Sequence, residues 1–197
     1  ETPLRTRPPR HYPVVMALAT HWTAEMVRAL PDDGNRYEVV DGELLVTPSP
    51  ARRHQAVLWR LQVALATYLK SVDLVDAGVT SPADISWAGD ILVQPDLFVV
   101  APAEARAAWP GIQTLLLVVE VLSPGTARAD RNRKRLAYQR HDVGCYWIVD
   151  HEHATVEIWR PGDTAPTLER ERVLWQISAH APLLEISLTE LFAEMPG

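Results

Sequence analysis

A single carboxylate, Glu120, interrupts one of the most apolar segments of the chain, TLLLVVEVL at residues 114–122. If this segment is a strand, alternation places Glu120 among leucine and valine side chains on one face, and the opposite face is apolar as well. A strand with two apolar faces is covered on both sides, where an ionised carboxylate costs several kcal/mol unless a cation pairs with it. We therefore expect either a cation beside Glu120 or a strand that ends there in solvent.

A second acid, Asp96, lies in the apolar segment ILVQPDLFVV directly after Pro95. Because Pro95 limits strand pairing on one side, Asp96 could also be a turn or strand-start residue. If the strands of Asp96 and Glu120 are adjacent and antiparallel, the two carboxylates meet and repel each other unless a divalent cation lies between them. Mg²⁺ suits such a pair because it takes few protein oxygens and keeps several waters. The two acids together predict an open metal site.

The third candidate is Lys134, one of two lysines in a chain with 17 arginines. A Lys retained among so many arginines can mark a place that needs a compact ammonium, although chance retention is the alternative and fits Lys70 at a helix end. Lys134 shares an i, i+4, i+8 stripe with Asp130 and Tyr138. The same segment holds five arginines that form either a solvated helix face, the safer interpretation for most of them, or a phosphate track: Arg128, Arg131, Arg133, Arg135 and Arg140.

The elements that must position these residues follow an α/β order. Thr23 is expected to cap a short helix, and RYEVVDGELLV predicts a hairpin around Asp41-Gly42, a type I′ turn signal. Helical spacing of apolar residues predicts a long helix over 51–70, another near 127–141 and a short one at 189–193. Strands are expected at 72–79, 82–87, 91–100, 114–122, 145–150 and 154–160.

Length and composition restrict the class of protein. With 197 residues, of which 47% are hydrophobic, the chain can bury a core of its own. We expect residues 1–20 to be an extended proline-containing arm and residues 21–197 to be one domain with its core at about 35–160. The single cysteine excludes an intramolecular disulfide framework, and no apolar run suits a bilayer or a signal peptide, so we expect a cytoplasmic protein without membrane contact. A net charge of −6 argues against general polyanion binding but permits a local basic groove.

Three segments, QPDLFVV, VVEVLSPGTARADRNRKRLAY and GCYWIVD, occur in this order. They resemble the Uma-two family of restriction-type endonucleases, which belongs to the PD-(D/E)XK nuclease superfamily. The resemblance covers about residues 35–160 and implies an α/β restriction-endonuclease-like fold, with a central mixed β-sheet flanked by helices and an N-terminal β-hairpin. The chain departs from the superfamily pattern at Leu122, because a Lys is usual two positions after the Glu.

The resemblance implies a Mg²⁺-dependent phosphodiesterase, with Mn²⁺ as a substitute ion, that acts on nucleic acid. DNA is the more favoured substrate, and a homodimer is expected by analogy with restriction enzymes. Asp96, Glu120 and the carbonyl of Val121 would hold the ion, which would polarise the scissile phosphate and lower the pKa of a bound water. Lys134 would supply the ammonium that Leu122 lacks, and would orient the water or stabilise the developing negative charge.

Further residues could border this site, namely Glu43 and His54 after the DGEL turn and Asp130 and Tyr138 on the helix. Glu43 could equally be an exposed hairpin acid, and His54 an ordinary residue at a helix start. The His151-Glu152-His153 sequence has ligand-like spacing, but it lies between two expected strands and is more typical of a polar turn.

Two other classes of function stay open. The chain could be a degenerate nuclease fold that binds nucleic acid or a protein partner without cleavage, and Leu122 favours this alternative. It could also be a glycosidase with paired carboxylates, with a sugar platform formed by Trp87, Trp109 and Trp147, although tryptophans are more typical of protein cores. Retention of all three candidate catalytic residues favours the nuclease.

Overall fold

The protein is described by a computed structural model that covers residues 21–80, 83–108 and 111–194. The expected arm at 1–20 lies outside the described residues. The large sheet is built from β3 (Gly78–Thr80), β6 (Leu97–Val100), β7 (Leu115–Val121), β8 (Tyr146–Asp150), β9 (Thr155–Trp159) and β10 (Thr167–Glu169). Its strand order is β10-β9-β8-β7-β6-β3, in which β7 and β8 run parallel and the other neighbours antiparallel. The expected central mixed sheet is confirmed.

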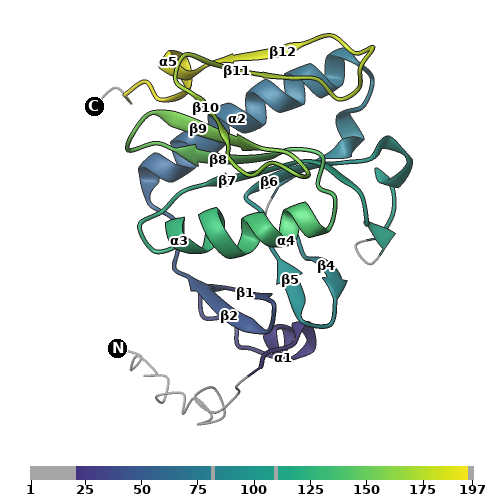
Figure 1. Ribbon diagram of the computed structural model, residues 1–197, viewed down its shortest axis with the longest axis vertical. Coiled ribbons are helices and arrows are strands. Elements are labelled where there is room, and N and C mark those ends of the chain that lie inside the picture. Colours follow the sequence, from purple (N-terminus) through teal and green to yellow (C-terminus); the bar gives the residue numbers. More distant parts are fainter. Residues whose placement is uncertain (1–20, 81–82, 109–110, 195–197) are drawn as a thin grey trace, which may run out of the picture.

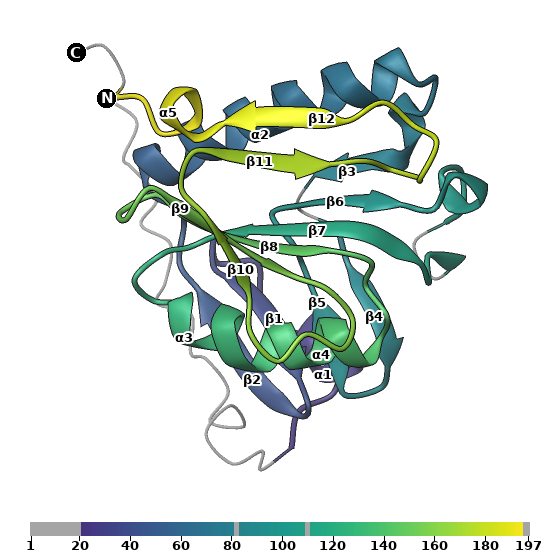
Figure 2. The same cartoon turned by 45° about the horizontal axis from the view of Figure 1, so that its top comes forward.

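Helices cover both faces of this sheet (Figures 1 and 2). The long helix α2 (Arg52–Ser71) lies on one face, and its apolar stripe, which includes Val57, Leu61 and Leu65, is buried in the core. The other face is covered by a continuous helix made of α3 (Ala127–Ala129), a π-helical turn (Asp130–Lys134) and α4 (Arg135–Arg140). A two-stranded sheet, β11 (Arg172–Trp175) and β12 (Leu184–Ser187), runs along α2 and is followed by α5 (Leu188–Leu191).

The predicted N-terminal hairpin is confirmed as β1 (Arg36–Val40) and β2 (Glu43–Thr47). Its two turn residues, Asp41 and Gly42, have φ angles of 54° and 75°, as a type I′ turn requires. The hairpin belongs to a small sheet of order β2-β1-β5-β4, with β4 at Ile85–Ala88 and β5 at Ile91–Val93. A short helix, α1 (Ala24–Arg28), precedes it, and Thr23 caps this helix by accepting a hydrogen bond from the Met26 amide.

The segment 91–100, expected as one strand, forms two strands in two different sheets. β5 pairs with β1 and β4, whereas β6 pairs with β3 and β7. The break follows from Pro95, which has no N–H to donate to a ladder. The amide of the preceding residue, Gln94, donates instead to the Glu38 carboxylate at 2.7 Å. Residues 94–96 therefore carry the chain from the small sheet to the large one.

A second correction concerns the expected strand at 72–79. The helix α2 continues to Ser71, Asp73 then adopts a positive φ of 57°, and Val75–Ala77 form a 3-10 helix before the short strand β3. Val72 and Leu74 are only half-buried and Val75 is 54% exposed, so the apolar residues of this segment lie on a turn and not on the covered face of a strand. The other predicted strands and helices end within about three residues of the structure's own bounds, as boundary predictions usually do.

The buried apolar side chains of the two main layers form one cluster that includes residues from Val40 to Leu191. A smaller cluster, which includes Trp22, Val27 and Val39, lies beneath the hairpin. Among the described helices, none has both the length and the apolar character that a membrane span needs.

Candidate active site

Asp96 and Glu120 lie at the same edge of the large sheet. Leu97 at the start of β6 is opposite Val119 of the antiparallel strand β7, so the next position outward places Asp96 beside Glu120. The expected antiparallel pairing of the two segments is thus confirmed, and both carboxylates are buried. Because the ladder ends at Leu97, the amide of Val121 has no strand partner there and donates to Asp96 Oδ2 at 2.9 Å.

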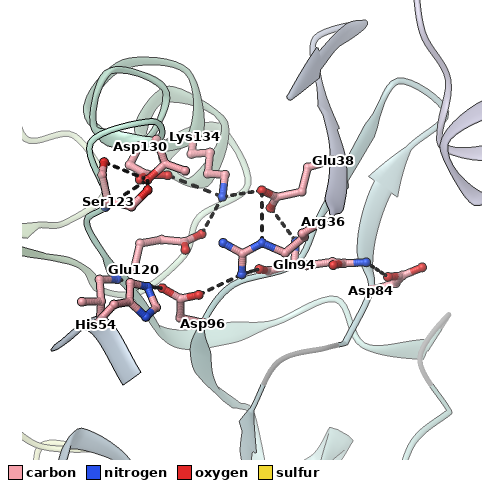
Figure 3. Close-up of polar contacts among 12 residues, drawn as sticks. Arg36, Glu38, His54, Asp84, Gln94, Asp96, Glu120, Ser123, Asp130 and Lys134 are labelled. Carbon is pink, nitrogen blue, oxygen red and sulfur yellow. Dashed lines mark hydrogen bonds and ion pairs between the residues drawn. The ribbon is translucent and has the colours of Figure 1, made fainter. Parts of the chain in front are cut away.

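The cation expected beside Glu120 is Lys134. Its Nζ lies 2.9 Å from Glu120 Oε1, 2.8 Å from Glu38 Oε2 and 3.5 Å from Asp130 Oδ1 (Figure 3). Tyr138 donates its hydroxyl to the same Glu120 oxygen at 3.1 Å. With a side-chain exposure of 2%, the Lys134 ammonium is held entirely by protein groups.

The stripe of Asp130, Lys134 and Tyr138 is not built by a regular α-helix. Residues Asp130–Lys134 form a π-helical turn, which is a rare geometry that is frequent at functional sites. All three side chains nevertheless point to the buried face, where Lys134 contacts Asp130 and Tyr138 contacts Glu120.

Two further members of the site, Arg36 and Glu38, were not predicted from the sequence. Both come from β1, and Glu38 is fully buried. Arg36 donates through Nη1 to Asp96 Oδ1 at 2.8 Å and to the Gln94 carbonyl at 3.0 Å. Strand alternation in RYEVV places the two charged residues on one face. Together with the hairpin turn, this alternation is the sequence signal that points to both residues. We call the set Arg36, Glu38, Asp96, Glu120, Asp130 and Lys134 the central cluster.

Of the two expected bordering residues after the hairpin turn, one lies at the site. His54, in the first turn of α2, is buried with its Nε2 3.1 Å from Asp96 Oδ2. Glu43 is exposed on β2 and forms an ion pair with Arg133, outside the central cluster. Its alternative interpretation as an exposed hairpin acid therefore describes the structure better.

A cavity of about 540 Å³ opens beside Asp96. Its walls are the loop at residues 48–51 before α2 and the turn at residues 123–126 before α3. Arg36, His54, Asp96 and Val121 also line it. The Asp96 side of the central cluster thus faces a space large enough for a bound group, while Lys134 and Glu120 lie behind it.

The central cluster carries more negative than positive groups, with four carboxylates against one guanidinium and one ammonium. Burial, together with repulsion from Asp96 and the other acids, raises the pKa of Glu120 to about 8 despite the nearby ammonium of Lys134. Burial raises the pKa of Asp130 as well. Burial alone would lower the pKa of Lys134, but the three carboxylates around it raise it. The Lys134 ammonium therefore stays charged, but its single positive charge cannot neutralise all three carboxylates around it.

Asp96 behaves differently from Glu120. Burial alone would raise its pKa, but its contacts with His54 and Arg36 lower it to about 2. Asp96 is therefore a carboxylate at neutral pH, and it is the acid that faces the cavity. An anionic oxygen donor at a cavity wall is what a hard cation such as Mg²⁺ binds.

The donor set of the central cluster suits a divalent ion that prefers oxygen. Glu38 Oε2 and Asp130 Oδ1 are buried and approach Lys134 only as ion pairs, without hydrogen-bond geometry. No group of three or more His, Cys, Asp or Glu side chains within the described ranges is arranged to hold a metal. An ion held by Asp96 and Glu120 could take a backbone oxygen as a further ligand. Val121 fits this role because the N–H and C=O of one strand residue point to the same side, here toward Asp96.

The remaining candidates from the sequence are accounted for by structural roles. His151-Glu152-His153 forms the expected polar turn, in which Asp150 accepts hydrogen bonds from two backbone amides of the turn. Trp147 is completely buried and Trp87 stacks on His141, while Trp109 lies outside the described residues. Four of the five helix arginines contact protein partners, namely Arg131, Arg133, Arg135 and Arg140.

Comparison with known proteins agrees with this fold. No curated protein matches the chain. One similar solved structure is the crystal structure of "a putative nuclease belonging to DUF820" from Anabaena variabilis ATCC 29413, with a TM-score of 0.71 and 19% identity over 87% of this chain and 97% of that chain. The family model Uma2, described as "Putative restriction endonuclease", matches residues 24–191. Because this match spans most of the chain and includes the whole central cluster, the protein belongs to the Uma2 family of nucleases.

Proposed function

We propose that the chain is a Mg²⁺-dependent endonuclease that hydrolyses phosphodiester bonds of nucleic acid, with DNA as the more favoured substrate. The observation that carries this proposal is the convergence of Asp96, Glu120 and Lys134 from two strand ends and the following helix. Asp96 lines a cavity of about 540 Å³, and Glu120 and Lys134 lie behind it. Two acids for an ion and one ammonium for a phosphate are the groups that this reaction requires.

Asp96, Glu120 and the Val121 carbonyl are the proposed metal ligands. A bound divalent ion would polarise the scissile phosphate and activate the attacking water. The two positive charges of the ion would then balance the two excess negative charges of the central cluster, and Glu120 would not need to be protonated. The proposed ligand set leaves several positions for water and substrate, as Mg²⁺ sites usually do.

Lys134 is the proposed stabiliser of negative charge on the phosphate. Leu122 is buried and apolar, so it cannot take the role that the superfamily gives to a lysine two positions after the Glu. The ammonium of Lys134 reaches Glu120 from the helix instead, at 2.9 Å. Asp130 and Tyr138 fix the direction of the Lys134 and Glu120 side chains, which supports a preorganised site.

A nucleic-acid phosphate fits the part of the cavity wall where α2 begins. The helix α2 begins there, its N-cap residue Ala51 offers no side-chain acceptor, and its first turn carries basic and no acidic residues. Basic residues at a helix N-terminus add to the positive end of the helix dipole rather than offset it. An anion is therefore favoured on the side of the cavity where α2 begins.

One observation favours the alternative of a nuclease fold that binds nucleic acid or a protein partner without cleavage. The two acids proposed as metal ligands already contact cations of the protein, Asp96 with Arg36 and Glu120 with Lys134. If these ion pairs persisted in the presence of metal, the fold would bind without catalysis. Cleavage assays separate the two cases.

The test combines cleavage with metal binding. Wild-type protein and Glu120→Gln are incubated with duplex DNA, single-stranded DNA and RNA in Mg²⁺, Mn²⁺ or EDTA. We expect metal-dependent cleavage by the wild type and background rates for the variant, because the variant lacks one ligand charge. Mn²⁺ should also raise the melting temperature of the wild type, because binding adds about 2.7 kcal/mol to the free energy of unfolding at 100 times its Kd. Metal binding that survives Asp96→Ala and Glu120→Ala unchanged would place the ion elsewhere, and wild-type inactivity on every substrate would favour the binding module.

Two organisational features complete the proposal. We propose that residues 21–197 form one domain, supported by a hydrophobic cluster with members from Val40 to Leu191. We also propose a cytoplasmic homodimer, by analogy with restriction-type nucleases in which each subunit cuts one strand. Light scattering on the full chain tests the dimer, and a monomeric mass with and without DNA would contradict it.

A further inference from the structure

Arg36 lies where the proposed metal would have to bind. Figure 3 shows its guanidinium beside the carboxylates of both Asp96 and Glu120, at the edge where the two acids meet. Nη1 is 2.8 Å from Asp96 Oδ1, so the guanidinium already neutralises one of the proposed ligands. A positive group in this position and a divalent ion on the same carboxylates repel each other.

The contacts of Arg36 leave part of the guanidinium uncommitted. Its hydrogen bonds to Asp96 and to the Gln94 carbonyl both use Nη1. Nε is buried, makes no hydrogen bond within the described residues and stays 3.9 Å from the Glu38 carboxylate. An unsatisfied buried donor costs free energy, which lowers the cost of moving the group away. The protein therefore holds the Arg36 guanidinium less firmly in its place than it holds the Lys134 ammonium.

Burial separates the two cations in the same way. The side chain of Arg36 is 19% exposed and lines the cavity, whereas that of Lys134 is 2% exposed and does not line it. A guanidinium at a cavity wall can turn into the cavity by changes in its own side-chain torsions. Lys134, enclosed by three carboxylates, has no such path.

We propose that Arg36 is the exchangeable cation of the site. It neutralises Asp96 in the metal-free protein, leaves that carboxylate when a divalent ion binds, and then binds a phosphate of the nucleic acid in the adjoining cavity. The planar fork of an arginine suits a phosphate in two-point contact. This inference rests on the proposed function, since it assumes that Asp96 and Glu120 hold the ion.

The proposal predicts effects of opposite sign on two ligands when Arg36 is replaced by Gln. Calorimetric titration of Mn²⁺ should show a dissociation constant about tenfold lower than in the wild type, because the competing cation is gone. Binding of a short DNA duplex in Ca²⁺, measured by fluorescence anisotropy, should weaken about tenfold, because a phosphate contact is lost. A folding defect would weaken the binding of both Mn²⁺ and DNA. Tighter Mn²⁺ binding together with weaker DNA binding therefore identifies the exchange.

A matched control is Arg28→Gln, which removes the same charge from an exposed ion pair with Asp84. It should leave both affinities unchanged. Arg36→Lys should keep part of the phosphate affinity and bind Mn²⁺ with a dissociation constant between those of the wild type and Arg36→Gln. An equal or higher Mn²⁺ dissociation constant in Arg36→Gln overturns the exchange while leaving the nuclease proposal intact. Wild-type Mn²⁺ binding that does not depend on Asp96 and Glu120 overturns both.

Discussion

Two charged clusters lie under the same helix on the same face of the large sheet, and they differ in almost every physical respect. Glu120, Ile148 and Glu157 are in register on β7, β8 and β9, so two acids flank one apolar residue on this face. Lys134 reaches the first acid and Arg131, one turn earlier, reaches the second. The sheet and the helix therefore present the same type of pair twice.

The second pair belongs to a peripheral cluster of Arg131, Asp150, His153 and Glu157. Arg131 contacts Glu157 at 2.6 Å and Asp150 at 2.8 Å, with 37% of its side chain exposed. Burial alone would raise the pKa of Asp150, but hydrogen bonds from Arg131 and His153 lower it. Each acid of this cluster has a matched donor, as in an ordinary structural ion pair.

The central cluster lacks this matching. Glu38 Oε2 and Asp130 Oδ1 are buried without a hydrogen-bond donor within the described residues, and burial raises the pKa of Glu120 where hydrogen bonds lower that of Asp150. The types of cation differ too, because Arg131 uses its fork for two carboxylates while Lys134 places one compact ammonium among three. Deep burial of acids without matched donors, rather than the presence of ion pairs, distinguishes a prepared site from a structural contact.

The largest expected difference between the clusters is catalytic. Lys134→Ala should lower the nuclease rate by a factor of roughly 10²–10³, as removal of one oxyanion donor does, and Lys134→Arg should restore little because the larger guanidinium cannot occupy the position of the ammonium. The control Arg131→Ala should keep wild-type activity. The measurement is Mg²⁺-dependent cleavage under single-turnover conditions, and equal rates in all four proteins would remove Lys134 from the mechanism.

The same substitution, Lys134→Ala, should also lower the stability of the fold. Because three carboxylates surround the ammonium, removing it leaves buried acids without a cation, which typically costs about 3–5 kcal/mol of unfolding free energy. Arg131→Ala should cost about 1 kcal/mol or less, since its pair is partly exposed. Urea unfolding of each variant should precede the rate measurement.

A smaller difference should appear in the pH dependence of stability, measured in EDTA. The pKa of Glu120 is raised to about 8, so the folded state holds a proton that the unfolded chain releases at lower pH. Its contribution is present below the unfolded pKa and is lost as pH rises toward 8, with a slope of at most about 1.4 kcal/mol per pH unit. Glu120→Gln should remove this decline.

Asp150 should show the opposite sign. Its pKa is lowered, so its contribution is present above the usual aspartate pKa and is lost as pH falls through the lowered value. Asp150→Asn should therefore cost stability at neutral pH and nothing in acid. Urea unfolding between pH 3 and pH 8 provides both profiles. If the stability of Glu120→Gln and that of Asp150→Asn differed from the wild type in the same way across this pH range, the contrast between the two clusters would be wrong.

Much of this arrangement could be predicted from the sequence, because its causes are local. Asp41-Gly42 specifies its turn, the apolar spacing of α2 specifies a long helix, and apolar residues on both faces of β7 specify a covered strand. The demand of Glu120 for a cation follows from the same burial argument, and Lys134 meets it.

The rest depends on tertiary structure. The partners of Asp96 include Arg36, which is 60 residues earlier in the chain, and no local pattern specifies such a contact. The break at Pro95 was visible in the sequence, but the use of the freed Gln94 amide by Glu38 depends on how the small sheet packs against the large one. The π-helical turn escaped prediction because its residues have ordinary helix propensities.

The smallest expected effect concerns the helix arginines, and it extends the comparison from the clusters to their surroundings. Arg131, Arg133 and Arg140 form ion pairs with acids of the protein, whereas exposed Arg128 forms none within the described residues. Arg128 also lies two positions after the cavity wall that ends at Thr126, where it can meet a phosphate of bound DNA. Arg128→Ala should therefore weaken DNA binding in Ca²⁺ by a few fold and lower the slope of log affinity against log salt by about one unit. Arg133→Ala, which removes a charge already paired with Glu43, should leave that slope unchanged. Equal slopes in the wild type and both variants would show that phosphate contacts come from outside this helix.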